Sequence, residues 1–160
     1  MKTRQIVLID AENLAGTGGL TTPMAQWVCN ALKTVVFISR NDIVIVGGDK
    51  RNAFHLDEIA KRFGGQIVLG TGPNGGDRAI QSAFEQIPNV VWSHTDFPIS
   101  RLVIASGDHY FALAAQVAKS KGHQVMTISK EGSLSKSLAK ISTKHIYLHD
   151  PSLFQISAIV

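Results

Sequence analysis

The sequence predicts a three-layer α/β/α domain built on a mostly parallel sheet of five or six strands. Two observations predict it. Short apolar runs alternate along the whole chain with segments that have helical periodicity or end at glycines. Strands and helices in strict succession favour right-handed crossovers, which place helices on both faces of a parallel sheet. The 160 residues are the length of one domain, so residues 1–160 are expected to form a single unit.

The first half of the chain contains three of the expected strands and three helices. Thr22 and Pro23 predict a helix that runs to about Phe37, with Thr22 as its N-cap and Pro23 at its first position. An amphipathic helix over 52–63 ends at Gly64 and Gly65, and a third helix over 78–86 follows a glycine-rich loop, 70–76. The apolar runs that predict strands are 5–10 (QIVLID), 42–47 (DIVIVG) and 66–69.

The second half repeats the pattern. Helices are expected over 109–121, closed by Gly122, and over 133–141, and strands over 101–105, 123–129 and 145–149. The irregular stretch 89–100 is expected to form a short edge strand and a loop. The apolar tail, 152–160, is expected to dock on the domain or on a second copy, which makes a homodimer a possible partner.

Composition excludes several classes of protein. The lone Cys29 excludes an intrachain disulfide framework and a zinc site of paired thiolates, and Cys29 is expected to be a core residue. The first apolar run is interrupted by Asp10 and Glu12, which argues against a signal peptide, and no apolar window is long enough to cross a bilayer. We therefore expect a soluble, cytoplasmic protein that does not bind membranes.

The chain is mildly basic, with a net charge of +4, which favours anionic partners. Lysines are concentrated between residues 119 and 144, where Glu131 is the only acid. Two interpretations have equal weight: these lysines form the solvated faces of two helices, or they form a phosphate-binding surface.

Three aspartates follow three different predicted strands. Asp10 ends the first strand, Asp77 follows the third, and Asp108 follows the strand 101–105, with Asn13 and Ser106 close by in sequence. Because ligands bind beyond the carboxyl ends of parallel strands, these side chains are expected to meet at one edge of the sheet. Taken singly, Asp77 and Asp108 are each also placed to cap the helix that follows.

Three carboxylates in one place repel one another unless a cation lies between them. Magnesium and manganese accept carboxylate and phosphate oxygens, and Mg²⁺ or Mn²⁺ is therefore the expected cofactor. Such an ion activates water for hydrolysis of a phosphodiester. The absence of cysteine ligands or a suitably spaced histidine pair argues against zinc.

Three segments of the chain, in this order and spacing, resemble the signature segments of NYN domains, which are nucleases of the PIN-like superfamily: Ile-Asp-Ala-Glu-Asn-Leu (9–14), Gly-Gly-Asp-Arg-Ala-Ile (75–80) and Ala-Ser-Gly-Asp-His-Tyr-Phe (105–111). The resemblance covers most of the chain and includes 122–148. It implies a metal-dependent ribonuclease with strand order 3-2-1-4-5. Asp10, Asp77 and Asp108 would be the catalytic, metal-binding acids.

The same resemblance suggests roles for other residues. Asn13 would position a metal-bound water or a substrate phosphate, and Ser106 would orient Asp108. The expected substrate is RNA, most simply single-stranded, and the basic residues expected to contact it are Arg78, Lys130 and Lys136.

The chain departs from the family pattern at two points. Tyr110 stands where a second aspartate is usual, and Ser142 and Thr143 occupy a region that often carries an acid. The alternative is therefore a catalytically weak or inactive NYN-type module that binds RNA or a protein. Glu12 is a candidate for supplying the missing oxygen.

Competing interpretations rest on weaker sequence evidence. Residues 70–75 form a G-x-G-x-x-G, which nominally fits a dinucleotide fingerprint, but an acid at the start of the following helix would repel phosphate. No G-x-S-x-G elbow indicates a hydrolase triad. Among the aromatic residues, Trp27 and Phe37 fit a buried helix face, whereas Trp92 and His94 are candidates for stacking on a base.

Overall fold

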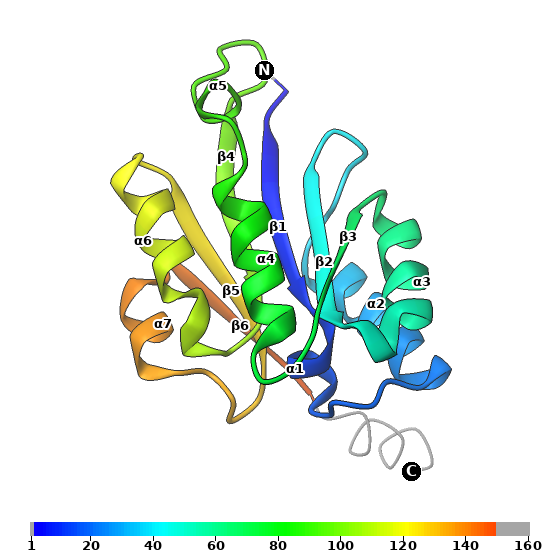
Figure 1. Ribbon diagram of the computed structural model, residues 1–160. Coiled ribbons are helices and arrows are strands. Elements are labelled where there is room, and N and C mark those ends of the chain that lie inside the picture. The colour runs from blue at the N-terminus through cyan, green and yellow to red at the C-terminus, as the bar shows by residue number, and fades with distance from the viewer. Residues whose placement is uncertain (1, 150–160) are drawn as a thin grey trace.

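The computed structural model describes residues 2–149, which form one six-stranded sheet with helices on both faces (Figure 1). All neighbouring strands pair in parallel. This confirms the predicted α/β class, and the first five strands have the order that the family resemblance implies. The strand order is β3-β2-β1-β4-β5-β6, with β1 (Arg4–Asp10), β2 (Ile43–Asp49), β3 (Gln66–Gly70), β4 (Ile99–Ala105), β5 (Gln124–Lys130) and β6 (Lys144–Leu148).

Successive residues of each strand face opposite layers, so the sheet separates two apolar cores. Val7 and Ile9 of β1 pack in one core, and Ile6 and Leu8 pack in the other. The first core lies under α1 (Ala11–Ala15), α2 (Thr22–Val35) and α3 (Ala53–Phe63). The second lies under α4 (Gly75–Glu85), α5 (Asn89–Trp92), α6 (Ala112–Ser120) and α7 (Lys136–Ile141). This arrangement is the predicted three-layer sandwich.

The predicted ends of the first long helix are wrong by one or two residues. Thr21, not Thr22, is the N-cap, because its side chain accepts a hydrogen bond from Met24 N at 3.4 Å. At the other end the backbone of Val36 is extended. The helix therefore stops before Phe37. This residue was predicted to lie on a buried helix face, but it is 82% exposed.

The stretch 89–100 contains no separate edge strand. Residues 89–92 form the helical turn α5, and the chain enters β4 at Ile99. Trp92 is buried and packs edge-to-face on Phe84, with ring centroids 5.7 Å apart. His94 Nδ1 accepts hydrogen bonds from the next turn of its own loop. The prediction that Trp92 and His94 stack on a base is therefore wrong, since both side chains hold this loop together.

Cys29 lies in the core, as predicted. No helix among residues 2–149 is long and apolar enough to cross a membrane. The expectation for the tail, 152–160, falls outside the residues that the structure describes.

Candidate functional site

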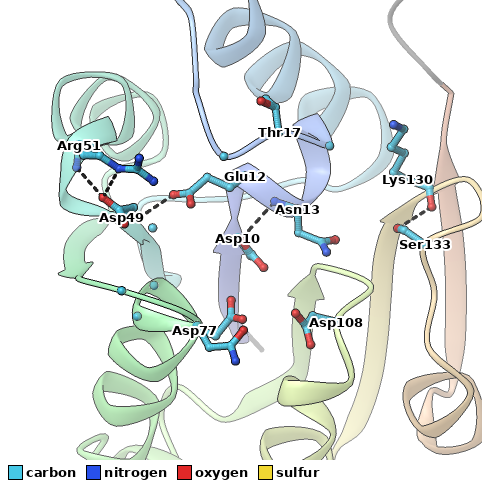
Figure 2. A pocket seen from close by; sticks show the side chains of 17 residues that line it. Asp10, Glu12, Asn13, Thr17, Asp49, Arg51, Asp77, Asp108, Lys130 and Ser133 are labelled. Carbon is cyan, nitrogen blue, oxygen red and sulfur yellow. Dashed lines mark hydrogen bonds and ion pairs between the residues drawn. The ribbon is translucent and has the colours of Figure 1, made fainter.

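The strand order reverses between β1 and β4, so the loops that leave these two neighbours diverge and open a crevice at their carboxyl ends. A cleft of about 540 Å³ lies there. Asp10 enters it from the end of β1, Asp108 from the loop after β4, and Asp77 from the first turn of α4 (Figure 2). The structure thus brings together the three aspartates that the sequence indicates.

Asp10 is held on the floor of the cleft. It is the last residue of β1 and the N-cap of α1, where one carboxylate oxygen accepts a hydrogen bond from Asn13 N at 3.3 Å. The other oxygen accepts a hydrogen bond from the Ser106 hydroxyl at 3.0 Å. Only 6% of the residue is exposed, so its remaining polar contacts must come from inside the cleft.

Ser106 and Asn13 connect the loops after β1 and β4. The Ser106 hydroxyl donates to Asp10 and accepts a hydrogen bond from Asp108 N at 3.1 Å. The side-chain oxygen of Asn13 accepts a hydrogen bond from Gly107 N at 2.9 Å. Ser106 therefore orients Asp108 through its backbone, in the position that the family resemblance implies, while Asn13 lines the cleft beside it.

The sequence placed Asp77 where it could cap the following helix, but Asp77 does not cap it. The helix α4 begins at Gly75, three residues earlier than expected, and its N-cap is Asn74 in the left-handed conformation. The early start is possible because α4 packs directly on β2: a Cβ on Gly76 would lie 2.6 Å from the Gly48 backbone. This close approach of two backbones brings Asp77 over the sheet edge and into the cleft.

Asp108 does act as a cap. Its side chain accepts a hydrogen bond from Tyr110 N at 2.9 Å at the start of the 3₁₀ turn η2 (His109–Phe111). His109 Nδ1 lies 3.3 Å from the same carboxylate oxygen. The capping and site interpretations of Asp108 are therefore compatible, since its second oxygen is not used by the cap.

The pKa values of Asp10 and Asp77 are both raised. Burial, followed by the charge of Asp77, raises the pKa of Asp10 well above its usual range, against the opposing hydrogen bonds from Ser106 and Asn13. Burial, followed by the charge of Asp108, raises the pKa of Asp77 to about 6. Asp10 and Asp77 therefore hold their protons more strongly than an isolated aspartate does.

Sequence reasoning missed two charged residues of the cleft, Asp49 and Arg51. Asp49 ends β2, and Glu12 Oε2 accepts a hydrogen bond from its backbone N at 2.7 Å. The signal was present in the sequence, since Asp49 follows a strand as Asp10 does. The predicted strand stopped too early, at Gly47. The structure shows why β2 continues: side chains of Ile80 and Glu12 fill the space over its two glycines.

The basic residues expected to contact RNA lie in different places. Lys130 lines the cleft on the side away from Arg51 (Figure 2). Arg78 does not line it; its guanidinium donates to Pro73 O at 3.0 Å and Thr71 O at 3.3 Å and braces the glycine-rich loop. Lys136 is exposed in the first turn of α7, outside the cleft lining.

The glycine motif 70–75 follows β3, an edge strand two places away from β1. A dinucleotide fingerprint belongs in the first strand-to-helix turn at the switch point. Here the residues after β1 are Ala11 and Glu12, without a glycine. At Gly70, a side chain would collide with the Gly75 carbonyl. The motif therefore has a packing role that leads the chain tightly into α4.

Across residues 2–149, no three His, Cys, Asp or Glu side chains are arranged so that they hold a metal ion as they stand. The donor chemistry of the cleft nevertheless suits a hard divalent cation, because carboxylate and amide oxygens surround it and thiolates are absent from its lining.

No family model matches the chain, and no curated protein does. Among solved structures, the chain is similar to a protein of unknown function from Vibrio parahaemolyticus. The two share 15% sequence identity, and the alignment covers 92% of this chain and 93% of that chain with a TM-score of 0.57. At this identity the similarity supports the fold.

Proposed function

We propose that this protein is a metal-dependent ribonuclease of the NYN type that hydrolyses RNA phosphodiester bonds in the acidic cleft. One observation carries the proposal: Asp10, Asp77 and Asp108 converge from three separate elements, and the pKa values of Asp10 and Asp77 are raised by burial and by mutual charge. Carboxylates in such an arrangement favour a ligand that neutralises them.

The three aspartates, which line the same cleft, would hold Mg²⁺ or Mn²⁺. When bound, such an ion supplies an activated water and neutralises charge on the phosphate. The chain's own residues do the positioning. Ser106 keeps Asp10 oriented through its hydroxyl and Asp108 through the backbone. Asn13, anchored on Gly107 N, presents its amide nitrogen as a donor to a phosphate oxygen.

The alternative is a module that binds RNA without cleaving it. The observation that favours it is Tyr110, which takes the place of a second aspartate and leaves the cleft with one acid fewer than the family pattern has. In that case the same cleft would bind RNA in a salt-sensitive way without turnover.

The test is cleavage of a fluorescently labelled single-stranded RNA in Mn²⁺ or Mg²⁺. We expect cleavage that a chelator abolishes and that falls about a hundredfold or more in Asp10→Asn and Asp108→Asn. Circular dichroism checks that both variants fold. Asp57→Asn, on the exposed face of α3, is the matched control and should cleave like the wild type.

Cleavage that survives both substitutions would overturn the proposed site. An absence of cleavage by the wild type, together with RNA binding that weakens with salt, would favour the non-catalytic module.

A further inference from the structure

A second hollow continues the cleft on the side of β2. It has a volume of about 500 Å³ and shares Asp49, Arg51 and Gly72 with the acidic cleft. Its other residues are Lys50, Thr71 and Pro73, which together with Arg51 are exposed. The two hollows thus form one path along the carboxyl edge, and the cations Lys50 and Arg51 stand at the point where the path leaves the carboxylates.

Arg51 is held in a defined position at this junction. Glu12 fixes the backbone of Asp49 through the 2.7 Å hydrogen bond to its N–H. The carboxylate of Asp49 then accepts hydrogen bonds from Arg51 N at 2.9 Å and from Arg51 Nε at 3.0 Å. The Asp49 side chain is 17% exposed and that of Arg51 is 75% exposed. The guanidinium is therefore oriented at its base and open to solvent at its end.

Asp49 remains ionised in this arrangement, because the hydrogen bond from the Arg51 backbone lowers its pKa. It differs in this from Asp10 and Asp77, whose pKa values are raised. The carboxylate of Asp49 is already engaged by Arg51, so its role is to position that side chain.

The opposite wall of the second hollow is the loop 71–73. The Arg78 guanidinium donates to the carbonyls of Pro73 and Thr71, one at each end of the loop. Gly72 between them has a φ of 76°, which a side chain would disfavour. Hydrogen bonds therefore hold this wall in place, as they hold the wall that carries Arg51.

We propose that the second hollow binds the phosphate next to the scissile one on a single-stranded RNA, with Lys50 and Arg51 as its contacts and Arg78 as a positioning residue. This inference rests on the proposed function, which places the scissile phosphate among the aspartates. Lys130 lies on the far side of those aspartates (Figure 2). The RNA strand then crosses the aspartates with Lys130 on one side and Lys50 and Arg51 on the other. These basic groups offset the repulsion between RNA and the carboxylates.

Binding is measured in the cleavage-deficient Asp10→Asn protein by anisotropy of a labelled single-stranded 12-mer in Mg²⁺. Adding Lys50→Ala and Arg51→Ala should weaken binding about tenfold and reduce the slope of log affinity against log salt by about 0.7, the value for one neutralised phosphate on a single strand. Arg40→Ala, an exposed arginine in the loop between α2 and β2, is the matched control and should leave both unchanged.

Arg78→Ala separates positioning from contact. We expect it to weaken binding while the salt slope stays that of the parent, because Arg78 donates to the loop and not to RNA. A reduced slope in this variant would overturn its positioning role.

Cleavage supplies an independent readout in the otherwise wild-type protein. The Lys50→Ala/Arg51→Ala variant should lose efficiency on the 12-mer through KM, and the loss should be much smaller on a dinucleotide, which has a single phosphate. Unchanged affinity and unchanged KM on the 12-mer would overturn the subsite. If the wild type cleaves nothing but its binding depends on Lys50 and Arg51, the hydrolytic function fails and the RNA-binding subsite stands.

Discussion

The two ends of the sheet use their carboxylates in different ways. At the amino end, Asp42 accepts hydrogen bonds from Gln5 N at 2.9 Å, Gln5 Nε2 at 3.0 Å and Ser39 N at 2.8 Å. At the carboxyl end, Asp10 and Asp77 face other carboxyl groups, and their pKa values are raised. One carboxylate has its hydrogen-bonding capacity filled by the fold, whereas the others are left for a ligand. The comparison separates a carboxylate that stabilises the fold from carboxylates available for function.

Adding a divalent cation should produce the largest effect that distinguishes the two ends. At a hundredfold excess of Mn²⁺ over its dissociation constant, the free energy of unfolding should rise by about 2.7 kcal/mol. Thermal melts with Mn²⁺ or with chelator measure it. Asp10→Asn should lose this increment and Asp42→Asn should keep it. An equal increment in both variants would place the cation elsewhere.

Removal of Asp42 should produce an effect of similar or smaller size, with no effect on the cleft. Asp42→Ala leaves the backbone N–H groups of Gln5 and Ser39 without their acceptor, and we expect a loss of about 2 kcal/mol in urea unfolding. Cleavage measured well below the melting temperature should stay within about twofold of the wild type. Asp57→Ala, which breaks an exposed pair with Lys61 at 2.9 Å, should cost less than about 0.5 kcal/mol.

The smallest expected effect is a stabilisation. The pKa of Asp77 in the folded protein is about 6, above its usual value of 3.8, so the folded state binds the proton more tightly than the unfolded state. The contribution of Asp77 to wild-type stability is therefore fully present below about pH 4 and is lost as the pH rises through 6. In chelator at pH 7.5, Asp77→Asn should be more stable than the wild type by about 1 kcal/mol, a value reduced by solvent screening of this half-buried group.

This gain should shrink as the pH falls to about 4, since Asp77 is then protonated in the folded wild type and partly protonated in the unfolded state. Urea unfolding of both proteins at pH 4, 6 and 7.5 measures the trend. A gain that is the same at every pH would mean that repulsion among the carboxyl groups is not its source.

Much of the fold was predictable, because buried parallel strands leave a simple signal. The apolar runs that form β1 and β5 are bounded within about a residue of their actual ends, and their alternation with helices fixes the three layers. Errors occurred where tertiary packing decides the local structure. Trp92 lies in an irregular stretch, yet it is buried because Phe84 of α4 lies against it.

The candidate site was predictable in its acids and not in its surroundings. Asp10 and Asp108 follow strands that the pattern marks clearly. Asp49 was missed because Gly47 and Gly48 look like the end of a strand, and only the three-dimensional structure shows that neighbouring side chains occupy their missing Cβ positions. Arg78 braces the loop before α4, and this role depends on contacts that sequence spacing does not encode.

The close approach of the Gly48 and Gly76 backbones also determines how near the start of α4 lies to the sheet. A single methyl group on Gly76 would act as a spacer that lifts the start of α4, and with it Asp77, from the floor of the cleft. In the proposed nuclease, the strength of catalysis would therefore depend on backbone atoms that never meet the substrate.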